Sequence, residues 1–236
     1  MHFARVRRPS LVLALLAVLA GCKSLGLDPA SPARNLTGFD EVEVLGRLTA
    51  EISVGDRFLV TVTGDQKLAR QVETRVEDQT LLVTTRQEGD TRLAERVRVR
   101  VVLPALARLQ AHGARVTVTG AATERLEVEA QKGATVTVDA IAAQRLVVEA
   151  IEGSRVVLVG SAESFQCALA QASRADARQL EVRTARVSVA DASRLDLRPR
   201  TALSGEASGA SRVAVWSKPR RVRVATRDEA RVTYVP

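Results

Sequence analysis

A short motif recurs seven times, at intervals of 18 to 20 residues, between residue 113 and the C-terminus of this 236-residue sequence. Its second position is Ala or Ser, its third is Arg or Thr, and most copies continue into alternating apolar and polar residues. The copies begin at Gly113, Gly133, Gly153, Ala172, Ala192, Ala210 and Glu229. A unit this short cannot bury its own apolar side chains, so successive units must stack on one another.

Each of the early repeats contains two strand-like runs separated by turns, such as residues 116–118 and 126–128. Leucine-rich repeats have a similar period but need Asn at a fixed position, and Asn35 is the only Asn in the chain. We therefore predict an all-β fold, a parallel β-helix or β-solenoid with about seven coils of 18–20 residues over residues 105–236. The small residues that open each motif predict a tight corner where successive backbones approach closely.

Residues 39–104 also alternate in the manner of strands but lack the repeat register. An open solenoid end would expose unpaired strand edges, so we expect this segment to form an N-terminal β-rich capping region. No segment shows a convincing helical pattern.

The N-terminal residues have the pattern of an export signal. Basic residues Arg5, Arg7 and Arg8 precede an apolar run over residues 11–20, which is too short to span a membrane. The run closes on Leu19, Ala20, Gly21 and Cys22, which resembles a bacterial lipobox. The resemblance implies a signal peptide over residues 1–21 and lipid modification of Cys22, the alternative being an ordinary signal peptide with an incidental Cys. Residues 22–38 then form a lipid-anchored linker.

Lys23 follows the lipidation site, where Asp would be associated with retention at the inner membrane. We therefore expect an outer membrane lipoprotein of the cell envelope, facing either the periplasm or the surface, with the membrane as partner through Cys22. If Cys22 is acylated, Cys167 has no intramolecular disulfide partner, and we predict a buried, unreactive thiol.

Composition argues against several function classes. Aromatic residues make up 3% of the chain, and removing residues 1–22 lowers the net charge from +8 to +5 and leaves His112 as the only His. We predict no nucleic-acid partner, no metal or cofactor site and no catalytic residues. His112 is interpreted as a solvated turn residue. The acid pairs Glu127 with Glu129 and Asp228 with Glu229 are interpreted as outward-facing strand or turn residues.

One binding hypothesis follows from the repeat. Stacking would align the arginines at its third position along one edge of the solenoid, interrupted by Thr135: Arg115, Arg155, Arg174, Arg194, Arg212 and Arg231. Such a row would suit an anionic polysaccharide or lipid headgroups. The alternative is that the side chains splay into solvent or pair with acids such as Asp176, Asp196 and Glu229.

Several segments resemble a known family. Residues 39–44, 60–65 and 76–83, followed by small-residue motifs such as residues 208–211, are similar to the bacterial putative auto-transporter adhesin head GIN domain family. The resemblance covers residues 39–236 and implies a solenoid-like all-β fold with a role in the envelope. Gln171 and Asp191 stand where the family motif often has Gly.

We therefore expect a lipid-anchored envelope protein that acts as a non-catalytic adhesion or ligand-binding module, with an anionic polysaccharide or an envelope protein as partner. One alternative is a structural or interaction lipoprotein that faces the periplasm. A carbohydrate-active β-helix enzyme is the less favoured alternative.

Overall fold

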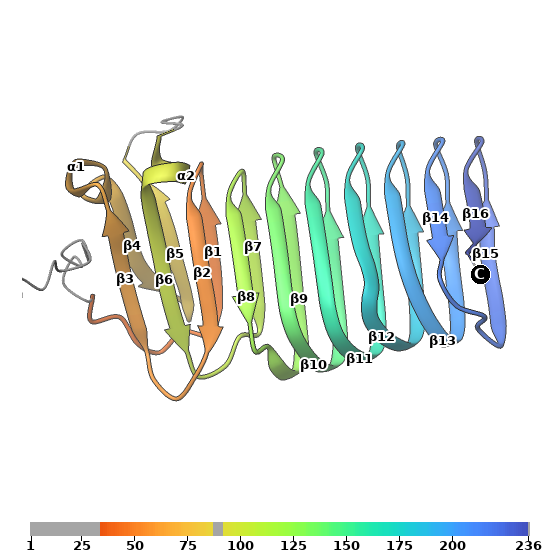
Figure 1. Cartoon of the computed structure of the whole chain (residues 1–236), viewed down its shortest axis with the longest axis horizontal. Coiled ribbons are helices and arrows are strands. Elements are labelled where there is room, and N and C mark those ends of the chain that lie inside the picture. Colours follow the sequence, from red (N-terminus) through yellow and green to blue (C-terminus); the bar gives the residue numbers. More distant parts are fainter. Residues whose placement is uncertain (1–33, 87–91, 236) are drawn as a thin grey trace, which may run out of the picture.

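The computed structural model describes residues 34–86 and 92–235. This part of the chain winds into a flattened parallel β-solenoid of about six turns, close to the seven coils predicted (Figure 1). Two walls of strands face each other along the rod, joined at one edge by stacked tight turns and at the other by rounded bends (Figure 1). The predicted all-β solenoid is confirmed.

Four long strands run through both walls: β10 (Thr135–Ala150), β11 (Arg155–Leu169), β12 (Arg174–Val189) and β13 (Arg194–Ala207). We name the wall that directly follows each tight turn the first wall, and the wall that leads into the next tight turn the second wall. Each strand bends between the walls, and the register shifts there, for example between Val157 and Val159 of β11.

Shorter strands complete the coils on either side of the long ones. Those before them are β7 (Arg108–His112), β8 (Arg115–Thr119) and β9 (Ala122–Gln131), and those after them are β14 (Arg212–Val215), β15 (Arg221–Thr226) and β16 (Arg231–Tyr234). The first wall contains β8, β14 and β16, while the second wall contains β7, β9 and β15. All of these strands pair in parallel with their neighbours along the rod.

The N-terminal region extends the stack and then closes it. Its strands are β1 (Glu41–Leu45), β2 (Thr49–Val54), β3 (Leu59–Gly64), β4 (Val72–Glu77), β5 (Thr80–Thr85) and β6 (Val97–Leu103). Strands β1 and β2 pair in parallel with β7 and β8, and β5 and β6 pair in parallel with β1 and β2. Strands β3 and β4 are antiparallel to β6 and β5 and end the stack, which confirms the predicted capping region.

Two single-turn helices, α1 (Gln66–Ala69) and α2 (Leu93–Arg96), lie in this region, where the sequence pattern predicted no helix. Asp65 caps α1, because its Oδ1 accepts hydrogen bonds from the backbone N–H groups of Lys67 and Leu68. Apolar periodicity cannot detect a helix of one turn, since a window of about 11 residues is needed to establish the period.

Parallel pairing aligns equivalent positions of successive repeats, for example Thr135 with Arg155 and Leu146 with Phe165. Side chains alternate between the interior and the solvent along each strand, so apolar positions stack into continuous columns inside the rod. Cys167 lies in such a column, paired across the strands with Val148 and Val187. It is a free, buried thiol whose pKa desolvation raises to about 12, as expected of an unreactive cysteine.

The tight turns between the walls use left-handed backbone at two consecutive residues, which is the signature of type I′ turns. The pairs at the later turns are Gln171 with Ala172, Asp191 with Ala192, Gly209 with Ala210 and Asp228 with Glu229. Backbone hydrogen bonds continue from turn to turn, such as the one from Ala172 N to Asp191 O at 2.8 Å. The close approach of successive backbones predicted at this corner is confirmed.

Candidate functional site

The six arginines predicted to stack do stack on the outward face of the first wall. Cross-strand pairing joins Arg155 to Arg174, Arg174 to Arg194, Arg194 to Arg212 and Arg212 to Arg231, while Thr135 separates Arg115 from Arg155. We name Arg115, Arg155, Arg174, Arg194, Arg212 and Arg231 the arginine row. Neighbouring strands in a sheet lie about 4.8 Å apart, so five guanidinium groups project from adjacent coils without interruption.

The structure adds one position that the sequence did not reveal. Thr49 of β2 pairs with Arg115 on one side and with Arg98 of β6 on the other, so Arg98 continues the line of the arginine row into the capping region. Residues 39–104 lack the repeat register, so spacing in the sequence could not place Arg98. Its Nε lies 3.2 Å from a carboxylate oxygen of Glu51, which partly neutralises it.

Most of the arginine row is not neutralised. Within the described residues, Arg194 is the one member whose side chain forms an ion pair, with its Nε 2.9 Å from Oδ2 of Asp196. Asp176, a predicted partner, is instead held by Arg178, whose side-chain hydrogen bonds keep the pKa of the Asp176 carboxyl below its usual range. Of the six arginines in the row, one is therefore neutralised by an acid within the described residues.

A small cluster fixes Arg194 in place. The indole Nε1 of Trp216 donates a hydrogen bond of 3.1 Å to Oδ1 of Asp196, whose other oxygen accepts from Arg194. The guanidinium of Arg178 lies 5.4 Å from the centroid of the Trp216 ring, within cation–π range. The only Trp of the chain is therefore engaged in holding the carboxylate that neutralises one member of the row.

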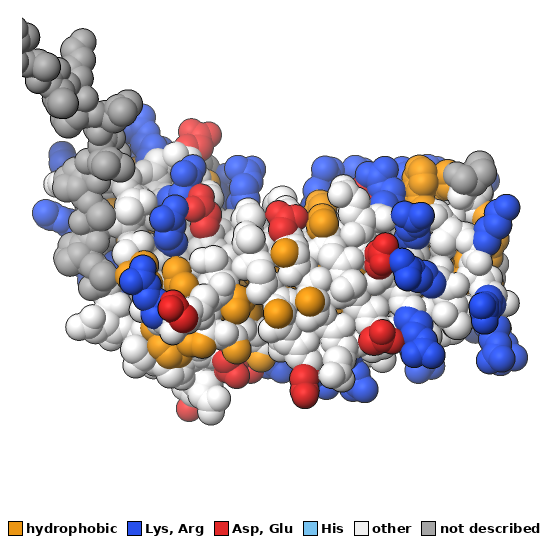
Figure 2. Space-filling model, turned by 60° about the horizontal axis from the view of Figure 1, so that its bottom comes forward, with side chains coloured by type: hydrophobic (Ala, Val, Ile, Leu, Met, Phe, Trp, Pro, Cys, Tyr) orange, Lys and Arg blue, Asp and Glu red, His pale blue; other side chains and the backbone are white. Residues whose placement is uncertain are grey.

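Charge is distributed unevenly along the solenoid. Residues 34–173 contain 17 Lys and Arg against 19 Asp and Glu, whereas residues 174–236 contain 14 against seven. Figure 2 shows Lys and Arg side chains gathered at the C-terminal end of the rod, on the right of the view. The stretch of the arginine row from Arg174 onward therefore lies in a basic half of the molecule.

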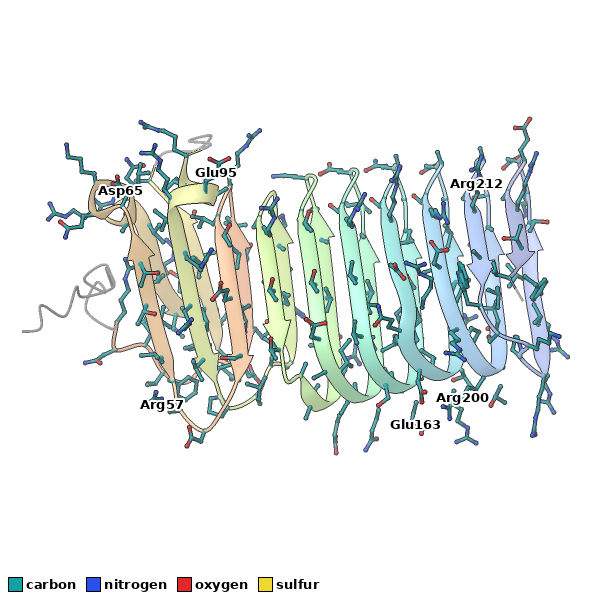
Figure 3. All side chains as sticks on the ribbon, in the orientation of Figure 1. Arg57, Asp65, Glu95, Glu163, Arg200 and Arg212 are labelled. Atoms are coloured by element: carbon teal, nitrogen blue, oxygen red, sulfur yellow. The ribbon has the colours of Figure 1, made fainter. Side chains whose placement is uncertain are left out.

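The rounded edge opposite the tight turns carries arginines of a different kind. There Arg200 lies 2.5 Å from a carboxylate oxygen of Glu181, and Arg183 lies 3.4 Å from one of Glu163. Figure 3 shows Arg200 and Glu163 along the rounded edge, whereas Arg212 projects beside the tight turns. These exposed arginines are already paired with acids. The rounded edge therefore serves as a control surface, because it carries arginines but no line of unpaired ones.

The acids considered for catalysis occupy the positions expected of them. Glu127 and Glu129 lie on the outward face of β9, and Asp228 and Glu229 form a tight turn. Burial acts to raise the pKa of Glu127, but hydrogen bonds from Arg125 and Arg108 outweigh it and hold that pKa below its usual range. The carboxylate is thus a neutralised partner of two arginines.

His112 is not the solvated turn residue that we expected. It is the last residue of β7, and its Nε2 is buried, without a hydrogen-bond partner, 3.9 Å from a carboxylate oxygen of Glu43. The strand ends at His112, so this residue belongs to β7 and not to the tight turn that follows it. A cavity of about 740 Å³ lies beside it at the tight-turn edge, lined in part by Arg47, Arg115 and Lys132.

The described ranges, 34–86 and 92–235, contain neither a metal-binding cluster nor a membrane-spanning helix. No group of three or more His, Cys, Asp or Glu residues there is arranged to hold a metal ion. No helix in those ranges is long and apolar enough to cross a membrane. Cys22 and the motif residues Leu19, Ala20 and Gly21 lie outside the described residues.

Residues 38–219 match the family described as putative auto-transporter adhesin, head GIN domain. A putative adhesin from Bacteroides fragilis has a TM-score of 0.80 at 12% identity, covering 86% of this chain and 95% of its own. A putative lipid binding protein from Parabacteroides distasonis has a TM-score of 0.67 at 14% identity, covering 87% and 96%. A putative adhesin from Parabacteroides merdae has a TM-score of 0.66 at 14% identity, covering 89% and 98%. No curated protein matches the chain.

Proposed function

Because the chain belongs to the putative auto-transporter adhesin, head GIN domain family, we propose that it is a lipid-anchored protein of the cell envelope that binds ligands without catalysis. Two of the structural neighbours are described as putative adhesins and one as a putative lipid binding protein, which supports a binding role. The ligand that the arginine row suits best is an anionic polymer, such as an acidic polysaccharide, lying along the axis of the solenoid.

The observation that supports this assignment is that, within the described residues, five of the six side chains of the arginine row form no ion pair. Arg155, Arg174, Arg212 and Arg231 are exposed, stacked on neighbouring coils and not joined to any acid within the described residues. Like charges at such spacing repel one another. A polymer with regularly repeated negative charges would relieve that repulsion at each coil and release the counterions that otherwise screen it.

Lipidation of Cys22 would also orient the solenoid relative to the membrane. Residues 22–38 would lead from the lipidated Cys22 to the capped end, where Arg34 N donates to Val60 O of β3. The basic coils after residue 174 would then lie at the end of the rod farther from the membrane. That orientation presents the unneutralised part of the arginine row to polymers outside the anchoring leaflet.

Polymer binding tests the proposal directly. The probe is polygalacturonate, an acidic polysaccharide, titrated against the purified chain at several salt concentrations. In the row variant, Arg174, Arg194 and Arg212 are each changed to Ser. The control variant changes three exposed arginines outside the arginine row to Ser, so that net charge falls by the same amount: Arg183 and Arg200 of the rounded edge, and Arg145 of β10, which lies near Glu163.

We expect the row variant to bind polygalacturonate about tenfold more weakly or worse, and the control variant to bind as the wild type does. Wild-type binding should also weaken as salt increases, because exposed charges are screened. Equal loss in both variants would mean that net charge alone attracts the polymer, and it would contradict a role for the arginine row.

A further inference from the structure

The turns along the tight-turn edge become shorter toward the capping region. Four residues join each strand from β10 to β13 to the next strand, whereas three join β9 to β10, two join β7 to β8, and three join β1 to β2. Figure 1 shows the edge stepping down toward β7 and β8, with α2 beyond the turn between β1 and β2. The cavity of about 740 Å³ lies at these short turns, and Ala94 and Glu95 of α2 also line it. We name it the turn cavity.

Cationic side chains surround the turn cavity. Arg47 comes from the turn before β2, Arg115 from the start of β8 and Lys132 from the turn before β10, and all three are exposed. Within the described residues, none of these three forms an ion pair. Glu95 is the one acid among the described residues that line the cavity. This excess of positive charge favours an anionic ligand.

The turn cavity also offers hydrogen-bonding groups. His112 lines it, and Nε2 of this ring is buried without a hydrogen-bond partner among the described residues. An unpaired buried polar atom costs free energy, which a hydrogen bond from a ligand would offset. Thr84 and Thr135 add hydroxyl groups to the wall. The volume lies within the range of roughly 300 to 1,000 Å³ typical of small-molecule sites, so a sugar that carries a carboxylate suits both its size and its chemistry.

We propose that the turn cavity binds the terminal sugar-acid unit of the anionic polymer. The inference rests on the proposed function, because Arg115 belongs both to the arginine row and to the cavity wall. The row passes from Arg155 across Thr135 to Arg115. Beyond Arg115 the next strand is β2, where the hydroxyl of Thr49 donates a hydrogen bond of 2.7 Å to Ala94 O of α2. A polymer that follows the row therefore meets α2 there, with its last unit at the cavity.

A short ligand separates this inference from binding along the row. The probe is digalacturonate, a fragment of polygalacturonate that is too short to follow the whole arginine row, and the neutral probe is digalactose, which lacks the carboxylates. Both are titrated calorimetrically against the purified full chain in detergent micelles. The cavity variant combines Arg47→Ser with Lys132→Ser. Its matched control combines Arg57→Ser with Lys67→Ser, which removes the same charge from exposed residues that do not line the cavity.

We expect digalacturonate to bind the wild type and the matched control equally, and the cavity variant about tenfold more weakly. Digalactose should bind none of the three measurably. The ring-nitrogen NMR signals of His112 should also shift when digalacturonate is added to the wild type, and they are readily assigned because His2 is the only other His of the chain. Undiminished digalacturonate binding in the cavity variant, or His112 signals that do not move, would overturn the inference.

The two proposals can fail separately. The row variant leaves Arg47, Arg115 and Lys132 unchanged, so it should lose polygalacturonate and retain digalacturonate. If polygalacturonate binds through the row and digalacturonate does not bind at all, this inference is wrong while the proposed function stands. If the row variant retains both ligands and the cavity variant loses digalacturonate, the role of the row is contradicted and the cavity site is supported.

Discussion

Arg174 and Arg194 are directly paired across β12 and β13, yet only Arg194 is neutralised by an acid. Asp196, whose side chain is 12% exposed, accepts hydrogen bonds from both Arg194 and Trp216. Two neighbouring members of one row therefore have different roles: one is part of a structural cluster, and the other is free to meet a ligand.

This difference predicts that substitution of the two arginines affects stability to different extents. Arg194→Ser should lower the free energy of unfolding by about 1 to 2 kcal/mol, because it leaves a nearly buried carboxylate with one partner fewer. Arg174→Ser should leave stability unchanged within about 0.5 kcal/mol or raise it slightly, since it removes a like charge. Urea denaturation of both variants measures the difference, and equal destabilisation would show that the Asp196 cluster does not distinguish the two arginines.

Acid should weaken the same region through Asp176. Hydrogen bonds from Arg178 lower the pKa of Asp176 in the folded protein, so this group adds stability above its unfolded-state pKa of about 4. That contribution is lost as the pH falls through the lower folded-state value. The free energy of unfolding should therefore fall less steeply between pH 5 and pH 3 in Arg178→Ala than in the wild type. Parallel pH profiles would contradict this assignment.

Gly205 should be among the least tolerant positions of the chain. Its φ is +133°, and a Cβ there would lie 1.8 Å from the carbonyl oxygen of Val187. Gly205→Ala should destabilise the protein by about 3 kcal/mol or more, because backbone atoms of the adjacent coil must move. Gly133→Ala is the control: its φ of +72° is also left-handed, but nothing lies within 4 Å of the added Cβ. The control should cost about 1 kcal/mol in thermal or urea denaturation.

The proposed lipid anchor at Cys22 can be tested on intact cells. We expect the wild type to be membrane-bound and accessible to added protease or antibody, and Cys22→Ala to be released or mislocalised, because the acyl chains supply the anchor. Membrane-bound protein that is shielded until the outer membrane is opened would contradict surface exposure and favour a partner in the periplasm. An unchanged distribution of Cys22→Ala would contradict lipid anchoring.

Periodicity made much of the fold predictable. Seven copies of one motif imply stacked coils, and stacking alone places Arg155, Arg174 and Arg212 in one line, as observed. The burial of Cys167 followed from alternation along a strand. These inferences needed only local pattern and a constant spacing.

Contacts between segments without a common register could not be predicted in this way. Arg98 joins the line of the arginine row through Thr49, across residues that do not repeat. His112 was expected to be a solvated turn residue, but it is the last residue of β7 and its Nε2 is buried.

The sequence by itself determined the coil length, the parallel stacking and the positions that share a line, because a repeat of nearly constant length specifies its own register. Only the tertiary structure decided which arginines are neutralised, since Trp216 and Asp196 are neighbours through the stacking of coils rather than through any shared motif. It also decided that the N-terminal end of the stack is closed by antiparallel strands, because β3 and β4 run opposite to β6 and β5.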